Sequence, residues 1–396
     1  MLQQLIDPIS PAKFWSEYFE KQPLHVARPM PEWCREMPSI DDLDAIISHT
    51  SVPDGRSKEH LIRRDAAFGV DYYLVERTAD GRPDMSAIYR AYAKGWTLAV
   101  YNLHQRSTPV ERLAASLSSE LGHEVYVNLY CTPSESQGLA AHADSHDAFI
   151  LQIEGRKSWR VFAPQYLTPL DAQETVLKRD ELGAPILEVT TEPGEVLYLP
   201  RGFIHEASRT EVPSMHLTIG VYSLRWLDLL EAGLRVAAER DERFRRTIPS
   251  FKPGDQTGAD NLGREFASLL QAAGDRDVAI EAMTRCIGAR SREFRTSPEP
   301  HFDSIEKARS LSGRSEVQRR LGWSTRVIQE GARVRIEFGA RSVSAPLIVA
   351  PALEFISTHQ RFRVADLPED LSEQSKIVLV RRLIHEGLLK LAAQTS

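Results

Sequence analysis

The fold and the chemistry of this chain are decided by residues 138–147, which read GLAAHADSHD. His142 and Asp144 are two positions apart, and on an extended segment this spacing places both side chains on the same face. Such a pair can share one metal ion, but a third ligand must come from a distant part of the chain. His205 is the best candidate, because the turn Pro200-Arg201-Gly202 before it can aim the following strand inward.

Two histidines and one carboxylate indicate a particular kind of metal site. Bound to one face of an ion, they leave three positions open, which is the facial triad of non-haem iron(II) oxygenases. An HxD pair alone is weak evidence, since most such pairs are surface residues or satisfied core groups. Other histidines compete for ligation, and of these His146 is expected in the outer shell or on the substrate side. The remaining competitors are His104 and His123.

Short segments with a period of two fill residues 97–224. Gly, Pro and Asp separate them, which is typical of strands joined by tight turns. We therefore predict an antiparallel sandwich or barrel. The segments are TLAVYNL (97–103), EVYVNLYCT (124–132), DAFILQIEG (147–155), KSWRVFA (157–163), ILEVTT (186–191), GEVLYLP (194–200) and SMHLTIGVYS (214–223).

The strand predicted at 157–163 has a lysine on its apolar side. Lys157, Trp159 and Val161 share one face, so the Lys157 ammonium is expected to point into the barrel. A buried ammonium needs an anion, and the distal carboxylate of 2-oxoglutarate is one candidate. In the alternative, Lys157 pairs with a structural Asp or Glu, or its ammonium reaches back to solvent.

Two other predicted strands each have one apolar and one polar face. In 124–132 the odd-numbered residues are apolar, while the even-numbered ones include Tyr126, Asn128 and Tyr130. In 214–222 the polar face begins with Ser214 and His216. A barrel with a polar interior accounts for both patterns; the alternative is that the polar faces contact solvent.

The bulk composition restricts the class of protein. The chain has 396 residues, of which 42% are hydrophobic and 26% charged, as in a globular protein of two or three domains. The net charge of -6 argues against a broad nucleic-acid-binding surface. Three scattered cysteines without a CxxC pair favour the reducing cytoplasm. No signal-peptide pattern and no run of about 18 apolar residues occurs, so we expect no membrane segment.

Helical patterns flank the strand-rich region. They are expected at 11–21, from the N-cap Ser39 onward, at 108–121 with Thr108 as N-cap, and at 225–246, 258–272 and 275–289. Residues 325–345 alternate as a strand pair would. The last fifty residues have the pattern helix, short strand, helix, strand. Segment 51–95 carries strand signals too weak to interpret.

Three motifs of this chain resemble those of one known family. They are QGLAAHADSHDAFILQIEGRKSWRVF (137–162), EPGEVLYLPRGFIHEA (192–207) and SMHLTIGVY (214–222). They are similar to the motifs of JmjC-type cupin oxygenases, specifically the ribosomal oxygenases. The resemblance implies an α+β fold: a double-stranded β-helix (cupin jelly-roll) barrel at 1–224 with a helical lead-in, a helical dimerisation domain at 225–320 and a winged-helix-like domain at 321–396.

The resemblance also implies roles for individual residues. His142, Asp144 and His205 would be the ligands of iron(II), and Lys157 would bind the distal carboxylate of the co-substrate 2-oxoglutarate. The polar residues implied around that co-substrate are Asn128, Tyr130, Ser214 and His216.

Two positions depart from the family pattern. The residue between the first two ligands is often aromatic in relatives and is Ala143 here, and relatives often lack a histidine where His146 stands. Both lie near the expected pocket mouth, so they leave the substrate open.

The resemblance implies that the protein hydroxylates a protein side chain, an arginine or histidine of a ribosomal protein, and works as a cytoplasmic homodimer. One alternative is hydroxylation of a peptide or small molecule in natural-product biosynthesis. Another is a non-catalytic cupin that serves as a binding module.

The winged-helix-like segment raises the question of DNA binding. The helix expected at 372–386 carries Lys376, Arg381 and Arg382, but also Glu373 and Glu386. This mixed charge is a poor surface for phosphates. We expect a packing or protein-contact role rather than direct nucleic-acid binding.

Overall fold

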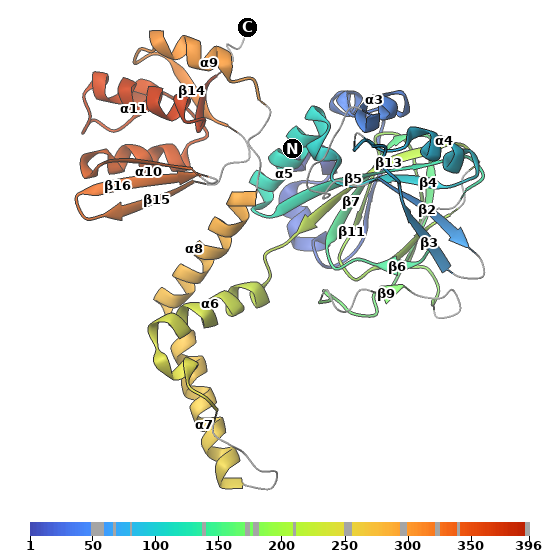
Figure 1. Cartoon of the computed structure of the whole chain (residues 1–396), viewed down its shortest axis with the longest axis horizontal. Helices are drawn as coiled ribbons and strands as arrows, with labels where there is room; N and C mark the ends of the chain where they lie inside the picture. Colours follow the sequence, from blue (N-terminus) through green and yellow to red (C-terminus); the bar gives the residue numbers. More distant parts are fainter. Residues whose placement is uncertain are drawn as a thin grey trace. The chain divides into compact units, whose positions relative to one another are not determined.

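The computed structural model describes residues 1–48, 59–65, 69–79, 81–136, 140–170, 175–176, 182–208, 211–248, 256–293, 299–320, 325–338 and 341–392. The chain divides into two compact units, Met1–Ser223 and Leu224–Ser396 (Figure 1). Each unit has its own hydrophobic clusters, and each is described by itself. Within the described residues, no helix combines the length and the apolarity needed to cross a membrane.

The N-terminal unit contains two antiparallel sheets, as predicted. The larger has the strand order β1-β11-β7-β13-β5-β4-β2-β3, and the smaller β10-β8-β12-β6-β9. The strands are β1 (Leu24–Val26), β2 (Glu59–Asp65), β3 (Gly69–Leu74), β4 (Thr97–Val100), β5 (Glu124–Thr132), β6 (His142–Ala143), β7 (Asp147–Glu154), β8 (Lys157–Phe162), β9 (Thr175–Val176), β10 (Leu187–Thr191), β11 (Val196–Leu199), β12 (Ile204–Ala207) and β13 (Ser214–Tyr222).

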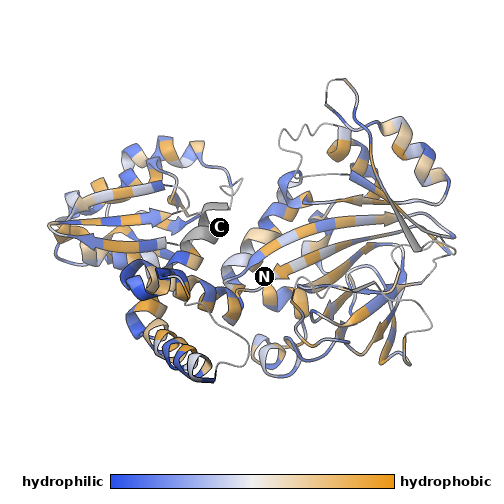
Figure 2. Ribbon diagram, turned by 60° about the horizontal axis from the view of Figure 1, so that its bottom comes forward, coloured by the Kyte–Doolittle hydropathy of each residue, from blue (hydrophilic) through white to orange (hydrophobic). Residues whose placement is uncertain are grey.

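The alternation of β5 and β13 gives the larger sheet two different faces. Their apolar residues belong to the main core, as Val127 and Leu129 of β5 and Ile219 of β13 show. The even-numbered residues of β5 line an internal cavity instead. Colouring by hydropathy shows apolar and polar residues alternating along the strands (Figure 2). The polar faces therefore point into the barrel, and the alternative in which they contact solvent is wrong.

Helices cover the apolar face of the larger sheet. They are α1 (Leu2–Ile6), α2 (Pro11–Lys13), which continues as a π-helical turn over Phe14–Tyr18, α3 (Leu43–Ser48), α4 (Met85–Ala93) and α5 (Thr108–Leu121). Leu113 and Leu117 of α5 are buried in the same core as β5. The helix has the predicted length, but its N-cap is Ser107 rather than Thr108. Ser39 begins its helix with a capping box, as expected.

Segment 51–95 contains elements that the sequence analysis did not identify. Strands β2 and β3 pair with each other, and β2 also pairs with β4, so they extend the larger sheet at one edge. Residues 49–58, 66–68 and 80 lie outside the described residues.

Three longer helices follow in the C-terminal unit: α6 (Trp226–Arg240), α7 (Gln256–Ala273) and α8 (Arg276–Glu293). The single helix predicted at 225–246 is wrong, because the backbone becomes extended at Asp241 and a separate 3-10 turn spans Glu242–Arg245. Helices α6 and α8 pack through small residues, as Ala237 and Ala282 are both buried in one cluster.

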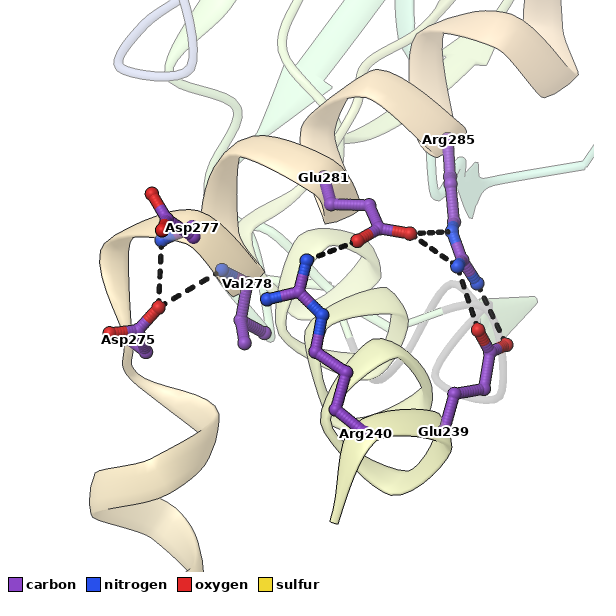
Figure 3. Close-up of polar contacts among 7 residues, drawn as sticks. All are labelled: Glu239, Arg240, Asp275, Asp277, Val278, Glu281 and Arg285. Carbon is purple, nitrogen blue, oxygen red and sulfur yellow. Dashed lines mark hydrogen bonds and ion pairs between the residues drawn. The ribbon is translucent and has the colours of Figure 1, made fainter.

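Ion pairs on the surface join α6 and α8 beside this cluster (Figure 3). Arg285 donates to Glu239 at 2.7 and 2.8 Å and also to Glu281, which in turn accepts from Arg240. Asp275 accepts from the backbone at the start of α8, an N-terminal cap. Exposed pairs contribute little stability, so their main effect is to favour one alignment of the two helices.

The end of the chain forms a small α+β region with its own core. The strand pair predicted at 325–345 is in fact three antiparallel strands, because residues 341–346 pair with 333–338 as a third strand. The final order helix, strand, helix, strand is confirmed. The elements are α9 (Phe302–Lys307), β14 (Glu316–Arg319), β15 (Thr325–Glu330), β16 (Arg333–Phe338), β17 (Arg341–Pro346), α10 (Ala350–Thr358), β18 (Arg361–Arg363), α11 (Glu373–His385) and β19 (Leu389–Leu391).

Candidate metal centre

Strand pairing in the smaller sheet brings the two candidate histidines together. His205 of β12 lies directly opposite His142 of β6, and their ring centroids are 4.3 Å apart. Asp144 follows β6 immediately, and its carboxylate oxygens lie 3.8 Å from His142 Nε2 and 3.7 Å from His205 Nε2. Among the described residues, these three side chains form the group whose ligand atoms all lie within 4.8 Å of one another.

Backbone hydrogen bonds fix which nitrogen each histidine turns to the cluster. His142 Nδ1 lies 2.8 Å from the Ala140 carbonyl oxygen, and His205 Nδ1 lies 3.1 Å from that of Phe203. A carbonyl only accepts, so each Nδ1 carries the proton and donates it. Each Nε2 then has a free lone pair that points toward Asp144, which is how metal-binding histidines are oriented.

The electrostatics of the cluster keep its members ready to bind a cation. Burial lowers the pKa of His205 to about 4, so its ring is neutral near pH 7. Burial opposes ionisation of Asp144, but the adjacent His142, His146 and His205 outweigh it and hold the pKa of that carboxyl below its usual value. A neutral His205 imidazole and an ionised Asp144 carboxylate are therefore available together.

The spacing of the three groups fits a transition metal. Two ligands bound at about 2.1 Å can be no more than about 4.2 Å apart. The separations of Asp144 from His142 and from His205, 3.8 and 3.7 Å, lie below that limit. Imidazole and carboxylate ligands on one side of the ion suit iron(II), with the remaining positions open to the cavity.

Gly202 helps to position Asp144 and gives a stability prediction. Its N–H donates to the Asp144 carbonyl at 2.8 Å, its φ is +86°, and a Cβ there would overlap the Tyr166 carbonyl oxygen. We expect Gly202→Ala to lower the free energy of unfolding by about 3 kcal/mol, through left-handed strain plus the overlap.

Gly81→Ala is the matched control for this prediction. Gly81 has a similar φ of +80°, but a Cβ there would meet nothing within 4 Å. Its cost should stay at about 1 kcal/mol. Urea unfolding of both variants measures the difference, and equal losses would show that the overlap at Gly202 has no energetic effect.

The candidate metal residues open into one cavity of about 840 Å³ inside the barrel, hereafter the barrel cavity. This volume is within the range of small-molecule sites. The lining residues are Thr97, Tyr101, Asn102, Glu124, Tyr126, Asn128, Tyr130, Thr132, Ala140, His142, Ala143, Asp144, His146, Ala148, Ile150, Lys157, Trp159, His205, Ala207, His216, Thr218 and Tyr222.

Lys157 points into the barrel cavity, as strand parity predicts. Its side chain is only 1% exposed, and its Nζ has no hydrogen-bond partner within the described part of the chain. Burial lowers the pKa of this ammonium to about 8. No carboxylate in the described residues pairs with it, so the alternative of a structural Asp or Glu partner finds no support there.

The other predicted co-substrate residues lie in two different settings. His216 stacks on Tyr130 at 5.3 Å and lines the cavity with it; burial lowers the pKa of His216 to about 3, so the ring stays neutral beside Lys157. Asn128 also lines the cavity, where its Oδ1 accepts from the Asn102 backbone at 2.9 Å. Ser214 accepts a hydrogen bond from Gln152 at 2.9 Å and is not among the lining residues.

Several residues that line the cavity were not predicted from the sequence. Glu124 and Tyr222 continue the polar faces of β5 and β13 by one more step, so strand parity could have found them. Tyr101 and Asn102 come directly after β4. The backbone of Asn102 is left-handed, with a φ of +55°. An asparagine after a strand is a weak signal of such a turn.

Comparisons with known proteins identify the domain that contains this cluster. A model of the JmjC domain matches residues 101–229. Human ribosomal oxygenase 1 is 35% identical over 257 residues, which are 63% of this chain and 39% of the human protein. The bifunctional lysine-specific demethylase and histidyl-hydroxylase NO66 of Branchiostoma floridae is 28% identical over 433 residues, covering 98% of this chain and 67% of that protein. The chain spans about two fifths of the length of the mammalian relatives.

Solved structures show the same fold. The X-ray structure of YcfD from Escherichia coli matches with a TM-score of 0.60 at 18% identity and covers 97% of this chain and 98% of that one. YcfD, described as a ribosomal oxygenase, has also been solved in complex with cobalt and 2-oxoglutarate, and that structure matches with a TM-score of 0.58 at 17% identity. This chain therefore contains a JmjC domain and resembles the ribosomal oxygenases in both sequence and fold.

Proposed function

We propose that this protein is an iron(II)- and 2-oxoglutarate-dependent oxygenase that hydroxylates an arginine or histidine side chain of a ribosomal protein. One observation carries the proposal: a cluster of two histidines and one carboxylate shares one cavity with Lys157, a buried ammonium that has no protein anion in the described residues. The cobalt and 2-oxoglutarate complex of YcfD supports the choice of metal and co-substrate.

Different residues of this chain would bind the metal and the co-substrate. His142, Asp144 and His205 would hold the metal, and Lys157 would neutralise the distal carboxylate of 2-oxoglutarate. When bound, iron and 2-oxoglutarate supply the dioxygen chemistry of the reaction. The polar residues that line the barrel cavity would orient the substrate carbon beside the metal.

The direct test uses the protein loaded with iron(II) and 2-oxoglutarate. It is incubated with ribosomal proteins from a source strain that lacks its gene, and mass spectrometry then searches for peptides that have gained one oxygen atom. We expect one dominant Arg or His site together with succinate release. Activity on free peptides or small molecules but not on ribosomal proteins would favour the biosynthetic alternative, and no succinate with any substrate would favour a binding module.

The name of the Branchiostoma relative includes a demethylase activity. The same experiment distinguishes demethylation from hydroxylation of a carbon atom. Hydroxylation of an N-methyl group releases formaldehyde, whereas hydroxylation of a carbon in the side chain keeps the oxygen on the protein. We expect retained oxygen and no formaldehyde.

We also propose the domain roles of the C-terminal unit: residues 225–320 as a dimerisation domain and residues 321–396 as a winged-helix-like domain. β14 (Glu316–Arg319) pairs with β18 and β19, which supports placing the start of the second domain a few residues earlier, before residue 316. Lys376 is buried and donates to the Ala365 carbonyl, so it supports packing rather than phosphate contact. The free cysteines support the cytoplasm as the compartment.

Dimerisation can be tested on the exposed apolar residues of the helices. Phe266 of α7 is 63% exposed and Trp226 of α6 is 79% exposed, which is costly for a helix that stays unpartnered. We expect Phe266→Asp to convert a dimer into a monomer in light scattering. Gln271→Asp, a change at a polar and exposed position of the same helix, is the control and should leave the dimer intact. A monomeric wild-type protein would refute the role of this surface.

A further inference from the structure

His146 forms a flat aromatic pair with Tyr222 on the wall of the barrel cavity. The two rings are 4.7 Å apart and only 7° from parallel. Tyr126 contacts Tyr222 edge-on at 5.1 Å, and His104 contacts Tyr126 edge-on at 5.6 Å. The pair is therefore held in place by further rings rather than standing alone.

The backbone is adapted to admit the His146 ring. Gly220 lies on the cavity-facing side of β13, and a Cβ there would come within 2.8 Å of His146 Cδ2 and 3.0 Å of Nε2. Its strand partner on β7 is Ala148, another small residue of the cavity wall. A glycine inside a strand weakens it, so this position is best explained by the close approach of the ring.

His146 is placed for contact with a substrate rather than with the metal. Its ring nitrogens are not part of the group of ligand atoms within 4.8 Å that the described residues form. It is half-buried, and Tyr222 is 41% exposed, so the pair borders the cavity on its solvent side. Tyr222 covers one face of the ring, and His146 and Asp144 both line the barrel cavity.

We propose that His146 is a positioning residue: held by Tyr222 and admitted by Gly220, its ring is a flat wall on which a planar side chain of the substrate stacks. This inference rests on the proposed function, since it assumes that the reacting side chain reaches the metal through the barrel cavity. Stacking on a fixed aromatic ring favours guanidinium and imidazole groups over flexible or branched ones. The wall would thereby select the class of side chain and fix its distance from the metal.

The test measures binding rather than turnover. The full-length protein, loaded with Mn(II) and 2-oxoglutarate, is titrated with the Nα-acetyl amides of arginine, histidine, lysine and leucine. NMR line broadening gives each Kd, and paramagnetic relaxation gives the distance of each side chain from Mn(II). We expect the two planar side chains to bind about tenfold more tightly than the other two.

Four variants separate stacking from a merely structural effect. His146→Ala and Gly220→Ala should both abolish the preference for planar side chains, the second by displacing the ring. His146→Phe keeps a flat ring and should retain the preference. Gly183→Ala is the control, since a Cβ there would meet nothing within 4 Å.

The outcomes distinguish this inference from the proposed function. A wild-type protein that binds neither Mn(II) nor 2-oxoglutarate would overturn the proposed function. Intact Mn(II) and 2-oxoglutarate binding without a preference for planar side chains would overturn only the inference. A preference that survives in His146→Ala would do the same, as would planar amides that fail to bind measurably.

Discussion

Replacing Asp144 with alanine is expected to abolish succinate formation by the iron-loaded protein. The carboxylate is the only anionic member of the cluster, and it lies within 3.8 Å of both histidine Nε2 atoms. Loss of an outer-shell partner of a metal ligand already costs about 10- to 100-fold in affinity or activity. Loss of the charged ligand itself should therefore reduce turnover by more than about 100-fold.

The reason for so large an effect is that, among the described residues, no other carboxylate belongs to the metal cluster. The other carboxylate that lines the cavity is Glu124 of β5, and it is not part of the 4.8 Å cluster. His142 and His205 alone would bind a divalent ion with two neutral donors. Titration with cobalt should accordingly show a weaker site, measured by the loss of the visible absorption of the bound ion.

The matched control for Asp144→Ala is Asp41→Ala, which removes an exposed carboxylate from the same unit. It should leave turnover within about twofold of the wild type. Circular dichroism of both variants separates misfolding from loss of the metal. If folded Asp144→Ala turned over 2-oxoglutarate like the control, Asp144 would not be a ligand.

The sequence predicts this site well because strand parity is a strong rule. On an extended segment an HxD pair places both side chains on one face, and the pairing of β6 with β12 puts His205 opposite His142. The same rule identifies Lys157, since an inward-facing lysine on an apolar strand face stands out against its neighbours. Both inferences need only the period of the strand and no knowledge of the loops.

Other parts of the site could not be predicted from the sequence. The stack of His146 on Tyr222 joins residues from different elements, and no local pattern records that distance. The end of α6 at Asp241 could not be predicted either, because the helical pattern of the sequence continues past this residue. The Asp241 side chain accepts from the Arg243 backbone N–H, and this local hydrogen bond ends the helix. Tertiary contacts and side-chain capping decide such details, and periodicity does not report them.

Lys157→Met is expected to stabilise the protein without co-substrate and to abolish its response to 2-oxoglutarate. In the folded chain burial lowers the pKa of Lys157 from 10.5 to about 8. The unfolded chain therefore binds more protons between pH 8 and 10.5, and the wild type gains stability as the pH rises through that window. Below pH 8 Lys157 is charged in both the folded and the unfolded chain, and burying its ammonium lowers the free energy of unfolding by about 3 kcal/mol.

Methionine has a similar length and no charge to bury, so the variant should recover most of this free energy at pH 7. Thermal unfolding without 2-oxoglutarate measures the gain, and the gain should shrink as the pH approaches 10.5. Lys376→Met is the control: this lysine is also buried, but its Nζ already donates to the Ala365 carbonyl at 3.1 Å. Its loss removes a satisfied hydrogen bond and should not stabilise the protein.

The same substitution should weaken 2-oxoglutarate binding by about 100-fold or more, since a buried carboxylate would lose the cation that Lys157 provides. In the wild type the bound anion requires the protonated ammonium, so the Kd should stay level below pH 8 and rise about tenfold per pH unit above it. Calorimetric titration with 2-oxoglutarate between pH 6.5 and 9.5 tests the slope. A Kd that is independent of pH in the wild type, or unchanged in Lys157→Met, would mean that the distal carboxylate binds elsewhere. A stabilised variant that no longer binds 2-oxoglutarate would explain why a costly unpaired ammonium is kept in this core: its partner is the co-substrate.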